Sequence, residues 1–174
     1  PEKAPEFIGS PEVVETIPEP RMSMDYILGN PELPVAQFRE TLVTAVNKSQ
    51  VLVVTAETGA GKSTQIPQFL AEEGYEVVVT QPRVVATRSV AERVRSEVVA
   101  ARGEAYKDFV GYRTRNEHGD SDENQILFVT DGLQQVRELS GRGVGKKQVL
   151  VLDEVHEWNE NMEVLVAWAK MRMN

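Results

Sequence analysis

Short apolar runs alternate with longer amphipathic stretches along most of the chain. β-branched residues dominate the runs, each too short for a buried helix, so we expect interior strands at 51–55, 77–80, 126–130 and 149–152. Helical patterns lie roughly at 62–73, 84–102, 132–139 and 162–171. Phe38, Leu42 and Val46 also recur at helical spacing ahead of the first run. This alternation predicts an α/β fold with a parallel sheet covered by helices on both faces.

The first 34 residues differ from the rest of the chain. They hold seven of the nine prolines and no sustained apolar period, and they carry two basic against seven acidic side chains. We therefore expect residues 1–34 to form an acidic, proline-rich N-terminal arm that serves as a linker or docking strap. The folded domain is expected over 35–174, with polar loops at 116–124 and 140–147.

Charge is unevenly distributed. The net charge of -8 argues against binding nucleic acid through overall positive charge. Residues 80–115, however, hold eight basic and four acidic side chains, a net of +4, which fits either a basic face or solvated helix arginines. The chain has no cysteine and no apolar run near the roughly 20 residues that cross a bilayer. We expect no membrane partner and an intracellular location, with the cytoplasm favoured and the nucleus as the alternative in a eukaryote.

The segment 56–63, with sequence AETGAGKS, follows one expected strand and opens an expected helix. This context predicts a P-loop, whose glycines let backbone N–H groups surround a phosphate chain at a helix N-terminus. Lys62 can reach the β- and γ-phosphates, and the Ser63 hydroxyl can ligate Mg²⁺. The nucleotide-binding residues are thus expected to be Thr58, Gly59, Ala60, Gly61, Lys62, Ser63 and Thr64. Ala56 replaces the usual first glycine, so its turn must tolerate a Cβ.

Two adjacent carboxylates, Asp153 and Glu154, follow the apolar run 149–152. Placing a carboxylate at the end of a buried strand costs free energy unless a partner group or a bound ion compensates its charge. One interpretation has Asp153 holding the Mg²⁺ shell while Glu154 orients or deprotonates the attacking water. The other makes either residue the N-cap of the next helix. The P-loop about ninety residues upstream favours the metal interpretation.

Six segments together resemble the first motor domain of DEAH-box helicases in order and approximate spacing. They are AETGAGKSTQIPQFL (56–70), TQPR (80–83), SVAERV (89–94), VGY (110–112), TDGL (130–133) and DEVHE (153–157). The resemblance covers residues 35–170 and implies a RecA-like P-loop fold that hydrolyses ATP with Mg²⁺. It also implies that His156 relays the state of the γ-phosphate to motifs that follow it in the chain. Arg93 is implied to stack on the nucleotide base. The groove for a single nucleic-acid strand would be lined by Thr80, Gln81, Pro82, Arg83, Arg115, Thr130, Asp131 and Gly132.

TQPR and TDG each follow an expected strand, which places them at the carboxyl edge of the sheet, where α/β proteins bind ligands. Small polar side chains and exposed N–H groups suit phosphate contacts. Taken alone, either segment is better explained as a loop turn or a helix cap than as a phosphate contact. Arg93 could likewise be an exposed helix arginine.

The sequence departs from the family at Trp158, where an arginine is usual, and at Asn116, where an aromatic residue is usual. It also stops before the Ser-Ala-Thr segment, whose strand we expect between the runs 51–55 and 149–152, and before the second RecA-like domain with its arginine fingers. We therefore expect a fragment of a longer chain that binds ATP but turns it over negligibly.

The favoured function is the ATP-binding motor domain of a helicase that acts on single-stranded nucleic acid, RNA before DNA, with a second RecA-like domain as its partner. One alternative is a P-loop NTPase for remodelling or signalling without unwinding. The other is a non-catalytic docking domain, against which the presence of Lys62, Asp153 and Glu154 argues.

Overall fold

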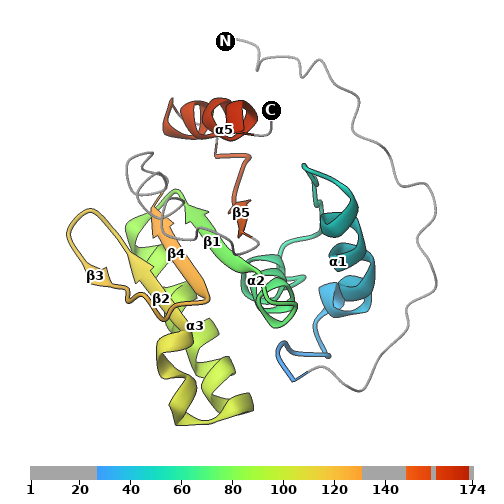
Figure 1. Cartoon of the computed structure of the whole chain (residues 1–174), viewed down its shortest axis with the longest axis vertical. Helices are drawn as coiled ribbons and strands as arrows, with labels where there is room; N and C mark the ends of the chain where they lie inside the picture. Colours follow the sequence, from blue (N-terminus) through green and yellow to red (C-terminus); the bar gives the residue numbers. More distant parts are fainter. Residues whose placement is uncertain (1–26, 131–147, 158–159, 173–174) are drawn as a thin grey trace.

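The computed structural model describes residues 27–130, 148–157 and 160–172 (Figure 1). Its elements in chain order are η1 (Pro34–Phe38), α1 (Arg39–Lys48), α2 (Lys62–Glu72), β1 (Glu76–Gln81), α3 (Val84–Arg102), η2 (Glu104–Phe109), β2 (Val110–Arg113), β3 (His118–Gly119), β4 (Ile126–Thr130), β5 (Gln148–Leu152) and α5 (Glu160–Arg172). Three of the four expected strands and the helices expected near 62–73, 84–102 and 162–171 are confirmed. The helix expected at 132–139 lies outside the described residues.

The strands form one mostly parallel sheet in the order β3-β2-β4-β1-β5. β1 pairs in parallel with β4 on one side and β5 on the other, and β2 extends the sheet in parallel beyond β4. The sequence pattern did not predict β2 or the short antiparallel β3. β2 has few apolar residues, and β3 pairs with it across a turn in which Thr114 and Glu117 are joined by two hydrogen bonds.

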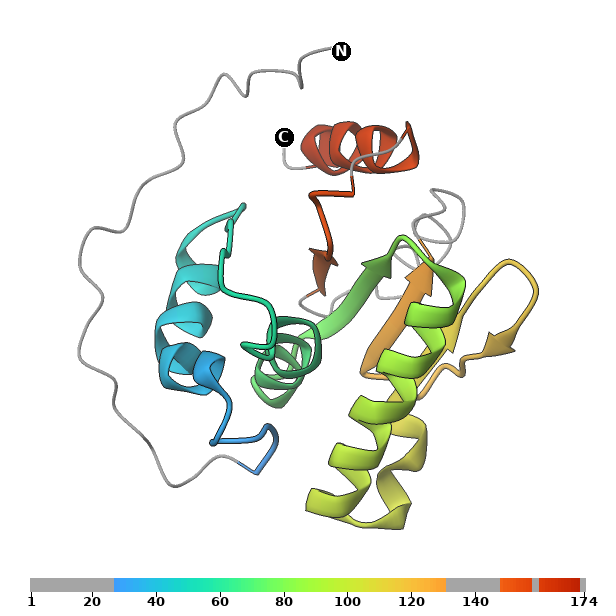
Figure 2. The ribbon, with the colours of Figure 1, turned by 180° about the vertical axis from the view of Figure 1, so that it is seen from behind.

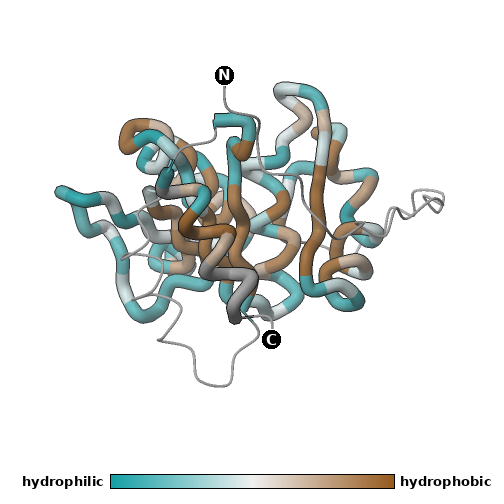
Figure 3. Tube along the Cα trace, turned by 90° about the horizontal axis from the view of Figure 1, so that it is seen from above, coloured by the Kyte–Doolittle hydropathy of each residue, from teal (hydrophilic) through white to brown (hydrophobic). Residues whose placement is uncertain are grey.

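Both faces of the sheet are covered, as predicted. Val77 and Val79 of β1 face a core shared with α2 and α3, while Val78 faces the opposite side and packs near Leu165 of α5. Figure 2 shows α3 lying across the back of the sheet. Hydrophobic residues follow the strands through the interior, and hydrophilic residues lie mainly on the loops (Figure 3). The period-two alternation along β1 is the physical basis of this arrangement.

The expectation of an interior strand at 51–55 is wrong in this structure. Val51 and Val53 are 61% and 71% exposed, and the segment forms no strand. Among the described residues the sheet ends at β5, and no further strand lies between β5 and this run. A strand needs a neighbour for its backbone N–H and C=O groups, so apolar patterning alone does not build one.

The end of the expected arm packs on the domain. Leu28 is 1% exposed and belongs to the core beneath α2 and α3. The backbone N–H groups of Ile27 and Leu28 donate to the carboxylate of Glu72 in α2. Val35 N–H donates to the carbonyl of Ala60 at 3.0 Å. This segment therefore contacts the loop that precedes α2; residues 1–26 lie outside the described residues.

The helices in the described ranges are either too short or too polar to cross a bilayer.

Candidate nucleotide-binding site

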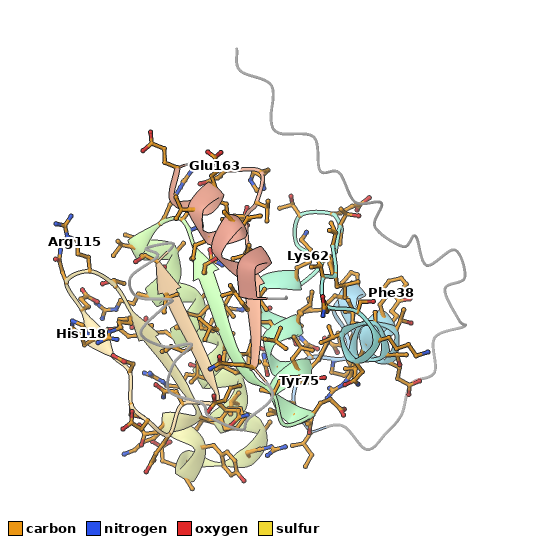
Figure 4. The ribbon with its side chains drawn as sticks, turned by 45° about the horizontal axis from the view of Figure 1, so that its top comes forward. Phe38, Lys62, Tyr75, Arg115, His118 and Glu163 are labelled. Carbon is orange, nitrogen blue, oxygen red and sulfur yellow. The ribbon has the colours of Figure 1, made fainter. Side chains whose placement is uncertain are left out.

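The loop before α2 has the backbone that its glycines predict. Gly59 and Gly61 adopt left-handed φ angles of 84° and 94°, and Gly61 is the residue from which α2 starts. Ala56 has no such φ, so the missing first glycine is tolerated, as expected. Lys62 Nζ donates to the carbonyls of Ala56, at 2.5 Å, and Glu57, at 3.3 Å. The ammonium thus lies inside the curve of the loop (Figure 4).

Asp153 is held at the carboxyl end of β5 by several hydrogen bonds. Its backbone N–H donates to Thr80 O at 3.2 Å, and its carboxylate accepts from the side-chain amide of Gln81 and from Glu154 N–H. The first helix after it in the described residues starts at Glu160, too far along the chain for Asp153 or Glu154 to cap it. The helix-cap interpretation of this acidic pair is therefore wrong.

Glu154 has a φ of 55°, the one left-handed non-glycine residue in the described ranges. Its Oε2 lies 3.0 Å from His156 Nε2, and its carbonyl accepts from Glu157 N–H at 2.8 Å. Glu157 in turn pairs with Arg83 at 2.9 Å. Unfavourable backbone of this kind is uncommon and concentrates at functional sites.

One open pocket joins segments that are far apart in the sequence. It has a volume of about 280 Å³ and is lined by Ser63, Gln81, Pro82, Arg83, Ala86, Val90, Glu154 and Glu157. The P-loop, the TQPR segment and the acidic pair therefore meet at the carboxyl edge of the parallel sheet, as α/β folds place their ligands.

The oxygen donors at and beside this pocket are of the kind that Mg²⁺ prefers. Ser63, which lines the pocket, offers a hydroxyl, and Asp153, hydrogen-bonded to the lining residue Gln81, offers a carboxylate. In the part of the chain that is described, no three His, Cys, Asp or Glu side chains cluster as a metal site. Mg²⁺ would therefore take most of its ligands from phosphates and water, as it does in other nucleotide sites.

The residues expected to contact a nucleic-acid strand differ in their solvent exposure. Thr80 and Gln81 are 0% and 3% exposed, so little of either residue is accessible to a nucleic-acid strand. Pro82 is half-buried, and Arg83 and Arg115 are exposed. Asp131 and Gly132 lie outside the described residues.

Strand order sets the positions of the accessible residues. The carboxyl ends of the parallel strands lie along one edge in the order β2, β4, β1, β5. The residues at or just after these ends follow in the same spatial order: Arg115, Thr130, Arg83 and Asp153. Arg115 lies at the tip of the β2–β3 turn, on the side of the sheet away from Lys62 (Figure 4). These residues therefore line an edge that crosses the sheet, with the pocket near one end.

Arg93 lies on α3 and is 65% exposed, and its Nε donates to Glu97 at 3.3 Å. Glu97 also accepts hydrogen bonds from Gln65 and Gln68 on α2. The sequence motifs do not predict a role for Glu97, Gln65 or Gln68. A signal existed, because Gln65 stands four residues before the buried Phe69 and so shares its helix face.

A phosphate-binding loop that opens a helix, beside an acidic pair at the end of a parallel strand, defines the class of P-loop nucleotide-binding proteins. A sequence profile described as the AAA domain matches residues 46–174, and the chain belongs to this family.

Two relatives place the chain more closely. It is 44% identical, over 143 residues and 79% of its length, to the pre-mRNA-splicing factor ATP-dependent RNA helicase prp22 of Schizosaccharomyces pombe. It is 36% identical, over 143 residues and 78% of its length, to the DExH-box ATP-dependent RNA helicase DExH1 of Arabidopsis thaliana. The resemblance to DEAH-box (DExH) helicases is confirmed. The chain spans 12% and 14% of the lengths of these relatives.

Proposed function

We propose that this chain is the ATP-binding motor domain of a DEAH-box helicase that couples ATP hydrolysis to movement along, or unwinding of, RNA. The observation that carries the proposal is the single pocket shared by Ser63, Gln81 and Glu154. It brings a phosphate-binding loop and a candidate base to one edge of the sheet. The names of both relatives, ATP-dependent RNA helicases, support RNA over DNA.

In this proposal the P-loop binds the phosphates of ATP. The N–H groups of residues 58–64, at the start of α2, favour the anionic phosphates together with the Lys62 ammonium. Lys62 must exchange the Ala56 and Glu57 carbonyls for phosphate oxygens. Ser63 and Asp153 would hold Mg²⁺, which supplies positive charge to neutralise the phosphate oxygens. Gln81 fixes the orientation of the Asp153 carboxylate.

Glu154 is the proposed general base. It lines the pocket and is half-buried, so its carboxylate can reach a water molecule there. His156, at 3.0 Å, can hold that carboxylate in place or release it when the contents of the pocket change. The left-handed backbone of Glu154 supports a functional role, because strain of this kind is retained where it is used.

The proposed RNA contacts lie along the carboxyl edge of the sheet. Arg83 and Arg115 are exposed cations that suit phosphate. Pro82, which follows β1, and Thr130, the last residue of β4, are half-buried. Contacts of this kind bind the sugar-phosphate backbone and read little sequence. By resemblance, a second RecA-like domain completes the groove and the ATP site. One relative is named a pre-mRNA-splicing factor, so we place the protein inside the cell.

The test is ATP hydrolysis by the full-length protein with and without single-stranded RNA or DNA. We expect stimulation by RNA, and we expect Glu154→Gln to keep ATP affinity while lowering turnover by about a hundredfold or more. Glu163→Gln, an exposed residue of α5, is the matched control. Hydrolysis that no single strand stimulates would favour an NTPase that does not unwind. Full activity of Glu154→Gln would remove Glu154 from the mechanism.

A further inference from the structure

We propose that Glu97 is a positioning residue that orients the guanidinium of Arg93 relative to the P-loop helix. Its role is to hold the base of the nucleotide in a set relation to the phosphates. The inference rests on the proposed function and on the resemblance to DEAH-box helicases, which implies that Arg93 stacks on the nucleotide base.

The two carboxylate oxygens of Glu97 have different partners. Oε2 accepts from Gln65 Nε2 at 2.9 Å and from Gln68 Nε2 at 2.7 Å, both on α2. Oε1 accepts from Arg93 Nε at 3.3 Å. One oxygen therefore attaches Glu97 to the P-loop helix, and the other faces the arginine.

The two glutamines that attach Glu97 to α2 are held rigidly, because both are buried and hydrogen-bonded. Gln65 and Gln68 are both 0% exposed. Gln65 Oε1 accepts from Asn30 N–H at 2.6 Å, and its Nε2 also donates to Thr64 Oγ1 at 3.0 Å. Gln68 Nε2 donates to the Thr64 carbonyl at 2.9 Å. Glu97 is thus tied to the helix turn that carries Lys62 and Ser63.

Arg93, in contrast, is mostly exposed, and a free arginine side chain samples many rotamers. A fixed carboxylate at its Nε restricts those rotamers and sets the plane of the guanidinium, whose face is the surface for stacking. The pair Arg88 and Glu92 on the same helix has the same spacing, but Glu92 is 51% exposed and has no such anchor described. It provides an internal control.

Glu97→Gln separates the two functions of the carboxylate. Its carbonyl oxygen can still accept from Gln65 and Gln68, while its NH₂ group then faces Arg93, donor against donor. The measurement is the dissociation constant of the full chain for ATP and, separately, for inorganic tripolyphosphate, which has no base. A residue that acts only on the fold or on the P-loop would change both constants together.

We expect Arg93→Ala to weaken ATP binding by roughly two- to thirtyfold, the range for an arginine on a ring face. Glu97→Gln should weaken it by at least about twofold and by no more than Arg93→Ala. Both variants should leave tripolyphosphate binding within about twofold, and Glu92→Gln should change neither constant. In the Arg93→Ala background, Glu97→Gln should add nothing, because the two act as one unit.

The outcomes distinguish a failure of the role of Glu97 from a failure of the base contact by Arg93. If Arg93→Ala leaves the ratio of the two constants unchanged, the base contact is absent and the inference falls with it. A ratio changed by Arg93→Ala but not by Glu97→Gln overturns the inference alone. If thermal melting shows that Glu97→Gln is unfolded, Glu97→Asp keeps the charge, withdraws it from Arg93 and must change the ratio in the same direction.

Discussion

Glu72 should stabilise the domain more than any surface charge, because one carboxylate serves four donors. Oε1 accepts from Ile27 N–H at 2.9 Å and Arg102 Nη2 at 3.2 Å. Oε2 accepts from Leu28 N–H at 3.0 Å and Arg39 Nη2 at 2.5 Å. The side chains of Glu72 and Arg39 are only 12% and 6% exposed. Glu72→Gln would remove the charge from this cluster and leave one oxygen as an acceptor.

The size of the effect follows from the burial of the ion pair. Breaking a buried pair by removing one partner costs about 3–5 kcal/mol of unfolding free energy. Arg39 would keep its bond to the Leu28 carbonyl, at 2.7 Å, and its place 4.7 Å from the centroid of Phe69. The side chain of Arg102 is 23% exposed, so water can replace its hydrogen bond to Glu72. We therefore expect Glu72→Gln to cost about 2–3 kcal/mol, below the full range.

The effect should depend on pH in a defined direction. Burial raises the pKa of Glu72, but hydrogen bonds from Arg39 and from the N–H groups of Ile27 and Leu28 outweigh it and lower the pKa below the ordinary 4.5. A lowered folded pKa means that the stabilisation is present above the unfolded pKa and is lost as pH falls through the folded pKa.

Urea unfolding followed by circular dichroism measures both effects. The control is Glu73→Gln, an exposed neighbour that should change stability by less than about 0.5 kcal/mol. The difference between wild type and Glu72→Gln should be constant near neutral pH and shrink below about pH 4.5. A loss no greater than that of the control, or a difference independent of pH, would refute the assigned role of the cluster.

Three further predictions concern ligand binding. Lys62→Ala should abolish ATP binding without lowering the melting temperature, because its ammonium contacts only loop carbonyls; unchanged affinity in calorimetry would contradict the P-loop assignment. Gly61→Ala should weaken ATP binding and stability, since a Cβ at φ +94° would lie 3.0 Å from Leu33; a variant with native melting and affinity would disprove this. Replacing Arg83 and Arg115 with alanine should reduce the salt-dependence slope of RNA binding by about 0.7 per lost contact; an unchanged slope would place the groove elsewhere.

The sequence by itself determined the elements whose pattern is local. The apolar runs at β1, β4 and β5 and the helical spacing of α2 and α3 give those elements, because short β-branched apolar runs and 3.6-residue periodicity report the burial of each segment directly. The P-loop and the acidic pair were equally visible, since their chemistry lies in consecutive residues, although the strand expected before the P-loop does not form.

Only the tertiary structure decided which segments become neighbours. The run 51–55 is as apolar as β1, yet it is exposed because no strand in the described sheet lies beside it. Gln81 bonds Asp153 and not solvent because β1 pairs with β5 in a register that aligns Thr80 with Leu152. Strand pairing and the contact of α2 with α3 join residues distant in sequence, and such contacts depend on the packing of the whole domain and leave no local periodicity to read.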